Sequence, residues 1–269
     1  MSNTQHFDVV VIGAGFSGLR MLWECRQLGL TTRVIEAAPD VGGTWYWNRY
    51  PGARTDSDSW VYAFSFSKEL QDDWDWQERY PTQPEALAYL QHVADRFDMR
   101  RDIQFETRME SAVYDETTNL WTVTTDHGDS YTCRYFVPAT GVLSLPYTPP
   151  FPGIDTFEGE TYVTGRWPKE PVDFTGKRVA VIGTGATGIQ AIPIIAQTAA
   201  HVTVFQRTPN YVLPARNYTL SDGERQAIRT DYDSIWDRAR EHFFGVAMDA
   251  PGGALQDATP AEQQRVLEW

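Results

Sequence analysis

Residues 8–18 read DVVVIGAGFSG, and this stretch decides the fold. Its opening part, Asp8–Ile12, is an almost continuous β-branched run, which is typical of a strand buried inside a parallel sheet. A helix is expected over 19–28, and Gly29 just after it suits the position that ends a helix. The next strand is expected over 32–36 (TRVIE). The pattern predicts a β-α-β unit within about thirty residues.

The turn between this strand and this helix carries three glycines, Gly13, Gly15 and Gly18. A dinucleotide site needs glycine for the tight turn, for the approach of the pyrophosphate and for close helix–strand packing. The pyrophosphate then lies on the amides of a helix that begins near Ser17. Glu36 ends the following strand, where a carboxylate binds ribose hydroxyls and repels a 2′-phosphate. The first turn therefore predicts FAD rather than a 2′-phosphorylated nucleotide.

The same arrangement recurs later in the chain. Residues 177–182 (KRVAVI) repeat the strand, 183–188 (GTGATG) repeat the turn, and 202–205 (VTVF) form the next expected strand. Here Arg207, not an acid, follows the second strand. A guanidinium offers a planar fork of donors that suits a 2′-phosphate, so the second turn predicts NADPH over NADH. The alternative for Arg207 alone is a solvated surface charge.

These units predict an α/β fold with two Rossmann-type dinucleotide-binding domains. The first domain is expected over 1–145 and includes a β-meander, in which strands at 121–125 and 131–137 flank a hairpin turn. The boundary is placed in the proline-rich linker 145–153 (LPYTPPFPG).

The second domain is expected over 146–269, with a helical segment at 221–248 and a capping box that opens another helix at Thr259. No convincing third strand follows Phe205, and the sequence stops at Trp269 inside the last expected helix. The expectation is therefore that this domain is incomplete.

Composition narrows the function classes. The 269 residues carry a formal net charge of −13, which disfavours nucleic acid and anionic membranes as partners. Cys25 and Cys133 form no CxxC motif, so a disulfide scaffold, a zinc site and a redox dithiol are not expected. The five histidines show no metal-ligand spacing. No signal peptide or membrane-length apolar stretch is visible, and a cytoplasmic protein without a metal is expected.

The segment 42–56 (GGTWYWNRYPGARTD) resembles the one that follows the first Rossmann unit in Baeyer–Villiger monooxygenases, a family of class B flavoproteins that includes phenylacetone- and cyclohexanone-type enzymes. Residues 73–81 (DWDWQERYP) continue the match. The stretch from Phe157 to Pro168 is similar to the family fingerprint F-x-G-x-x-x-H-x-x-x-W-[PD], with Trp167 where N- and S-oxygenating relatives usually carry Tyr. The resemblance extends to about residue 217.

Two departures accompany the resemblance. Val163 occupies the position of the fingerprint histidine and has neither a donor nor an acceptor. Family members are also much longer. Their later part supplies the rest of the NADP domain and the arginine that supports oxygen activation beside the flavin, and no residue here takes that role.

The resemblance implies site residues at three places. Contacts to FAD are implied for Ser17, Glu36, Thr44, Trp45, Tyr46, Trp47, Asp56, Tyr62 and Met109, beside the first glycine turn. Flavin and nicotinamide are implied to meet at Arg54, Thr55 and Asp56. NADPH is implied to be held by Gly183, Thr184, Gly185, Ala186, Thr187, Gly188, Ile189, Arg207 and Thr208.

Asp56 is the expected catalytic residue, because the family uses a carboxylate here to orient the catalytic arginine. Its alternative is a loop aspartate in an Asx turn. Trp45 and Trp47 either stack near the flavin ring or fill core.

The implied reaction is NADPH- and O₂-dependent conversion of a ketone to an ester or lactone. Two alternatives stay open. The chain is a catalytically impaired dinucleotide-binding fragment, or it is a flavin reductase or N/S-oxygenating flavin monooxygenase.

Overall fold

The computed structural model describes residues 4–212, 214–242, 245 and 259–268. The chain divides into two compact units. One unit comprises Met1–Asp56 with Tyr80–Tyr218, and the other comprises Ser57–Arg79 with Thr219–Trp269.

The larger unit contains a six-stranded sheet of order β3-β2-β1-β6-β5-β4. The first four strands of this order run parallel, and β5 and β4 continue the sheet in antiparallel fashion. The strands are β1 (Gln5–Ile12), β2 (Thr32–Ile35), β3 (Ile103–Gln104), β4 (Met109–Asp115), β5 (Leu120–Thr125) and β6 (Ser130–Pro138).

The central strand β1 is buried because it is paired on both edges and covered by side chains. Val10 and Val11 are fully buried, and Val10 belongs to an apolar cluster with Ile35, Val123 and Cys133. The β-branched run therefore forms the predicted inner strand of a parallel sheet.

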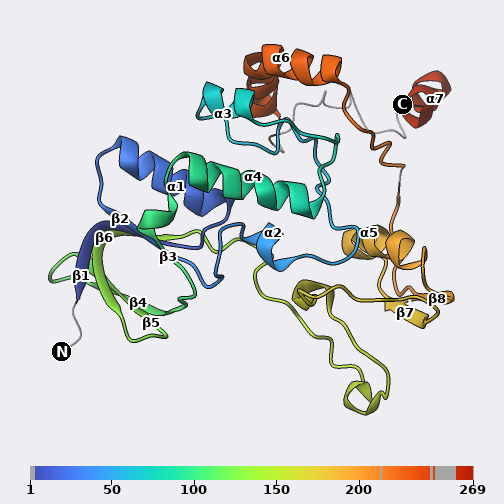
Figure 1. Ribbon diagram of the computed structural model, residues 1–269, viewed down its shortest axis with the longest axis horizontal. Helices are drawn as coiled ribbons and strands as arrows, with labels where there is room; N and C mark the ends of the chain where they lie inside the picture. Colours follow the sequence, from blue (N-terminus) through green and yellow to red (C-terminus); the bar gives the residue numbers. More distant parts are fainter. Residues whose placement is uncertain (1–3, 213, 243–244, 246–258, 269) are drawn as a thin grey trace. The chain divides into compact units, whose positions relative to one another are not determined.

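Two helices pack on this sheet side by side, α1 (Phe16–Gln27) and α4 (Gln83–Arg96) (Figure 1). The rings of Phe16 and Tyr89 lie 6.1 Å apart between them. Gly29 has φ +69° just past α1, as a left-handed C-terminal residue requires. The helix expected at 19–28 is thus confirmed, with its start slightly earlier, at Phe16.

The predicted hairpin is also confirmed. Strands β5 and β6 pair antiparallel around the turn at 126–129, where Gly128 has φ +78°. The same strand β6 pairs in parallel with β1, through Val10 opposite Phe136. One strand therefore joins the meander to the nucleotide-binding sheet.

The second β-α-β unit forms where the repeat predicts it. Strand β7 (Arg178–Ile182) pairs in parallel with β8 (His201–Phe205), and α5 (Ala186–Ile195) connects them. Phe174, Ala191 and Ile195 are its buried core. Together the two sheets confirm the Rossmann-type α/β class.

Between them, residues 145–153 contain no strand or α-helix, and Leu145 is almost fully exposed. Two short 3-10 helices follow, η2 (Ile154–Thr156) and η3 (Thr164–Arg166). Val163 is the residue that precedes η3.

The smaller unit is helical, with α3 (Lys68–Asp73), α6 (Asp222–Glu241) and α7 (Pro260–Glu268). Ser67 caps α3 by accepting a hydrogen bond from the Leu70 amide, and this helix is not among the elements expected from the sequence. Ser221 and Glu224 form a capping box at α6. The helix expected over 221–248 is confirmed as far as Glu241, and residues 243, 244 and 246–248 lie outside the described residues.

Neither described cysteine forms a disulfide; Cys25 and Cys133 are free and buried. Burial raises the pKa of both thiols, which keeps them protonated and unreactive. Among the described helices, none has both the length and the apolar character of a membrane span.

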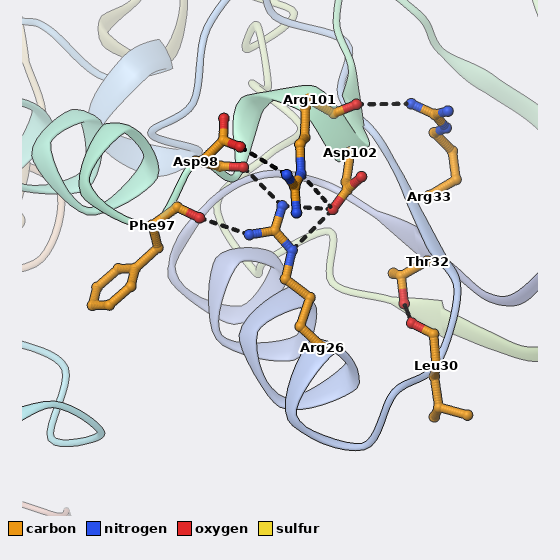
Figure 2. Close-up of polar contacts among 8 residues, drawn as sticks. All are labelled: Arg26, Leu30, Thr32, Arg33, Phe97, Asp98, Arg101 and Asp102. Atoms are coloured by element: carbon orange, nitrogen blue, oxygen red, sulfur yellow. Dashed lines mark hydrogen bonds and ion pairs between the residues drawn. The ribbon is translucent and has the colours of Figure 1, made fainter.

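The Arg26 side chain ties the end of α1 to the connection between α4 and β3 (Figure 2). Its guanidinium donates twice to Asp102 Oδ2, at 2.9 and 2.5 Å, and also to the carbonyl oxygens of Phe97 (2.6 Å) and Asp98 (2.8 Å). The Arg26 side chain is only 21% exposed. Asp102 ends the 3-10 helix η1 (Arg100–Asp102), so one guanidinium fixes both the α4 end and the entry to β3.

We predict that Arg26→Ala lowers the free energy of unfolding by about 2–3 kcal/mol, because it leaves a partly buried carboxylate and two carbonyls without their donor. Arg101→Ala is the matched control: this neighbouring arginine is 65% exposed, and its pair with Asp98 should contribute about 0.5 kcal/mol or less. Urea unfolding followed by tryptophan fluorescence measures both. Equal losses in the two variants would contradict the assignment.

Candidate dinucleotide-binding sites

The first glycine turn lies at the carboxyl end of β1, between β2 and β6, where the sheet order reverses. Gly13 has φ +102°, and its amide donates to the Ile35 carbonyl at 2.8 Å. A Cβ on Gly13 would lie 2.6 Å from the Ala139 oxygen, and one on Gly18 would lie 1.8 Å from the Gly13 oxygen. Glycine is therefore required at both positions. Ligands of parallel α/β sheets bind at such a reversal point.

The second glycine turn closely copies the first. Gly183 has φ +104°, and its amide donates to the Phe205 carbonyl at 2.9 Å. A Cβ on Gly188 would lie 2.5 Å from the Gly183 oxygen. Helix α5 then begins with the amide of Ile189 donating to Gly185 at 3.0 Å. Both turns thus direct a helix N-terminus toward the end of their strand, an arrangement that binds phosphate.

The surroundings of the two turns differ. A Cβ on Gly15 would lie 3.3 Å from the Cα of Gly43, and one on Gly43 would lie 2.8 Å from the Cα of Gly15. By contrast, a Cβ on Gly183 or Gly185 has no described atom within 4 Å. Gly42 and Gly43 therefore cover the first glycine turn. The backbone of the second turn, at Gly183 and Gly185, is uncovered in the described part of the chain.

Glu36 directs its carboxylate at the first glycine turn. One oxygen accepts from the Ala14 amide at 2.6 Å and the other from the Ala38 amide at 2.7 Å. The residue is 5% exposed. Two backbone donors compensate the cost of burying this negative charge and fix its position beside the turn.

Helix α2 (Thr44–Trp47) follows directly on the covering glycines. Trp45 and Tyr46 are buried, and the Trp45 carbonyl accepts a hydrogen bond from Gln83. Trp47 is 41% exposed and contacts the Tyr46 ring edge-on at 5.1 Å. The two tryptophans therefore differ: Trp45 fills the interior, and Trp47 keeps free ring surface.

The segment that carries Arg54, Thr55 and Asp56 runs beside the chain before α4. Arg54 forms an isolated bridge with Thr82, and the Thr55 amide donates to the Pro81 carbonyl at 3.0 Å. Thr55 is buried and Asp56 is exposed. Asp56 is the last residue of this part of the larger unit.

Three other residues fall in separate surroundings. Ser17 is exposed in the first turn of α1, at the first glycine turn itself. Met109 is half-buried at the start of β4 and packs against the apolar cluster formed by residues of the sheet. Tyr62 belongs to the smaller unit, where its amide donates to Asp58 and Ser59. The structure therefore brings Ser17 and Glu36 together at one turn, and describes Tyr62 in the other unit.

At the second turn, two side chains that sequence reasoning missed hold Thr184. The Gln206 amide nitrogen donates to Thr184 Oγ1 at 2.8 Å, and Asn210 donates to the Thr184 carbonyl at 3.1 Å. Arg207 and Thr208 lie between them, directly after β8, and both are exposed. The polar stretch 206–210 (QRTPN) at a strand end was the available signal. The first turn of α5 supplies the remaining predicted residues, Ala186, Thr187 and Ile189.

Comparison with known proteins gives similar chains of about twice this length. The chain is 45% identical to a phenazine N-monooxygenase of Lysobacter antibioticus over 98% of its own residues and 49% of the relative. It is 45% identical to a Baeyer–Villiger monooxygenase of Pseudooceanicola batsensis (strain ATCC BAA-863 / DSM 15984 / KCTC 12145 / HTCC2597) over 97% of its residues and 48% of the relative. A solved structure of an oxidized steroid monooxygenase bound to NADP matches with a TM-score of 0.93 and 51% identity, over 98% of this chain and 50% of that one. The chain thus spans about half the length of the curated relatives it matches.

Residues 6–228 match the model of the flavin-binding monooxygenase-like family. This match covers both glycine turns, the segment between them and the start of α6. The chain belongs to the flavin-binding monooxygenase-like family.

Proposed function

We propose that this chain provides the FAD- and NADPH-binding parts of a monooxygenase that inserts one oxygen atom of O₂ beside a ketone carbonyl, a Baeyer–Villiger oxidation. One observation carries the proposal. Two glycine turns of nearly equal geometry are followed by opposite charges, the Glu36 carboxylate at the first and the Arg207 guanidinium at the second. Such a pair suits two different dinucleotides in one chain.

The residues at the first turn fit FAD. The helix N-terminus at Ser17 offers amides and a positive dipole to a pyrophosphate. Glu36 is held in place by two amides, and its carboxylate suits ribose hydroxyls. The exposed ring surface of Trp47 suits a flavin, whereas buried Trp45 and Tyr46 would support it from behind. Thr44, Met109 and Tyr62 complete the proposed FAD contacts.

The residues at the second turn fit NADPH. The space beside Gly183 and Gly185 leaves the backbone of the turn open to a pyrophosphate. Arg207 and Thr208 are proposed to bind the 2′-phosphate, because both are exposed at the end of β8. The remaining proposed contacts are Thr184, Ala186, Thr187, Gly188 and Ile189.

Bound together, the two cofactors supply hydride transfer and the activation of O₂. The chain's own residues hold the nucleotides and orient the groups between them. Arg54, Thr55 and Asp56 are proposed to lie where the cofactors meet, with the exposed Asp56 carboxylate orienting a cationic side chain. Buried Thr55 fixes the backbone from which Asp56 extends.

The proposed division assigns FAD to 1–145 and NADPH to 146–269. The cytoplasm is the proposed compartment, and the free, buried thiols of Cys25 and Cys133 suit a reducing environment.

N-oxygenation is a second candidate. It is favoured by one observation, the 45% identity to a relative named as a phenazine N-monooxygenase. Both reactions would use the same two nucleotide sites, so substrate tests decide between them.

We expect the purified chain to carry FAD and to have its visible flavin absorption bleached by NADPH without oxygen. Joined to the later half of a curated relative, the chain should oxidise NADPH in air and convert cyclohexanone to a lactone, measured by gas chromatography, and phenazine serves as the nitrogen substrate. Conversion of phenazine alone would favour N-oxygenation. Hydrogen peroxide without either product would indicate a flavin reductase, and a colourless protein that binds no FAD would refute the proposal.

Arg207→Ala should weaken NADPH binding by about tenfold to a hundredfold and leave NADH binding unchanged, since a charged hydrogen bond to phosphate contributes about 1.5–3 kcal/mol. Arg178→Ala removes an exposed arginine from the opposite end of the same two-stranded sheet and is the matched control. Titration by protein fluorescence gives the affinities of the wild type and of both variants for NADPH and NADH. Unchanged NADPH affinity in Arg207→Ala would exclude this residue from the site.

Gly185→Ala separates ligand effects from folding effects. No described atom obstructs the added methyl group and φ is −72°, so the free energy of unfolding should change by about 1 kcal/mol or less. NADPH affinity should fall by about tenfold or more, because the methyl group occupies the space of the pyrophosphate. Gly18→Ala, where the methyl group meets the Gly13 carbonyl, should instead unfold readily. A Gly185→Ala variant with normal NADPH affinity would contradict the second site.

A further inference from the structure

The Gln190 side chain joins helix α5 to the segment that carries Arg54. Its Oε1 accepts from the Tyr50 hydroxyl at 2.8 Å and from the Arg54 amide at 3.4 Å. Its Nε2 donates to the Arg54 carbonyl at 3.1 Å. One half-buried carboxamide thus bonds both backbone groups of Arg54, although the two residues lie far apart in the sequence.

Backbone packing reinforces this contact. Gly52 has φ +78°, and a Cβ on it would lie 2.3 Å from the Gln190 carbonyl oxygen and 2.9 Å from Ile194. No larger residue fits there, so the turn at 50–53 touches the α5 backbone directly. Movement of α5 would therefore move this turn.

The opposite side of the segment is fastened to the chain before α4. The Ala53 carbonyl accepts from the Gln83 amide at 2.8 Å, and the Thr55 amide donates to Pro81. The Arg54 backbone is thus held between two supports, the start of α4 and the Gln190 side chain. Of these two supports, only Gln190 belongs to α5, the helix that begins at the second glycine turn.

Gln190 lies five residues after Gly185, which is about 7 Å along the helix from the end proposed to hold the pyrophosphate. We propose that Gln190 is a positioning residue that couples occupancy of the second nucleotide site to the placement of Arg54, Thr55 and Asp56. The inference rests on the proposed function, since it assigns NADP to α5 and the flavin contact to Arg54.

Glutamine meets a requirement that similar residues do not. The Arg54 carbonyl needs a donor, while its amide and the Tyr50 hydroxyl need an acceptor. Glutamate accepts but cannot donate, and leucine does neither at similar size. Gln190→Leu removes all three hydrogen bonds. Gln190→Glu removes the bond donated to the Arg54 carbonyl, and Tyr50→Phe removes the bond that the Tyr50 hydroxyl donates to Gln190.

Thermodynamic coupling tests the proposal. The FAD dissociation constant is measured by flavin fluorescence, without NADP⁺ and at saturating NADP⁺, and the ratio of the two values is the coupling factor. In the wild-type chain we expect NADP⁺ to change the FAD dissociation constant by about fivefold. In Gln190→Leu the change should be less than about twofold. Gln197→Leu, a change of the same kind at an exposed residue of the turn after α5, should keep the wild-type factor.

Hydrogen exchange of peptides covering residues 50–56 is the second measurement, and NADP⁺ should slow it in the wild type but not in Gln190→Leu. If Gln190→Leu does not fold, Gln190→Glu and Tyr50→Phe carry the test and should each reduce the factor. An unchanged factor in a folded Gln190 variant would overturn this inference alone. Wild type that binds both nucleotides without coupling would do the same, whereas wild type that binds no NADP⁺ would overturn the proposed function as well.

Discussion

The carbonyl oxygen of Gly13 occupies the space where a side chain on Gly18 would begin, 1.8 Å from the expected Cβ. This contact lets α1 start directly on the end of β1. The first-turn amides then face the carboxyl edge of the sheet, where the strand order reverses. A larger residue would lift the helix from the strand, uncovering the buried valines and turning the amides away. Gly188 and Gly183 impose the same condition on α5.

This constraint bears on how an acidic chain can bind anions. With a net charge of −13, long-range electrostatics oppose phosphate binding. Backbone amides and helix dipoles attract phosphate over a short range and add no net charge. A carboxylate such as Glu36 can therefore lie beside such a turn, because the amides of Ala14 and Ala38 donate to it and stabilise its charge. Only the second turn adds a guanidinium, which suits one more phosphate group.

Much of this fold follows from short-range patterns. The β-branched run at 8–12, the glycine spacing and the residue that ends each second strand are local features, and the structure has the expected elements at each. Contacts between distant residues could not be predicted in the same way. The pairing of β6 with β1 and the bonds from Gln190 to Arg54 depend on the folded sheet, since no periodicity in either partner specifies the other. Helix α3 was missed because six residues with a serine cap give too short a pattern.

The segment 42–56 shows why its sequence is so restricted. Near its beginning Gly43 packs against Gly15 of the first turn, and further on Gly52 packs against the Gln190 backbone one turn into α5. Each contact is too close for a side chain, so one β-α-β motif positions Gly43 and the other positions Gly52. The aromatic residues of α2 and the Arg54–Asp56 stretch are thereby held in register with both turns at once. Within the larger unit, the segment 42–56 therefore contacts both glycine-turn motifs, the first through Gly43 and the second through Gly52.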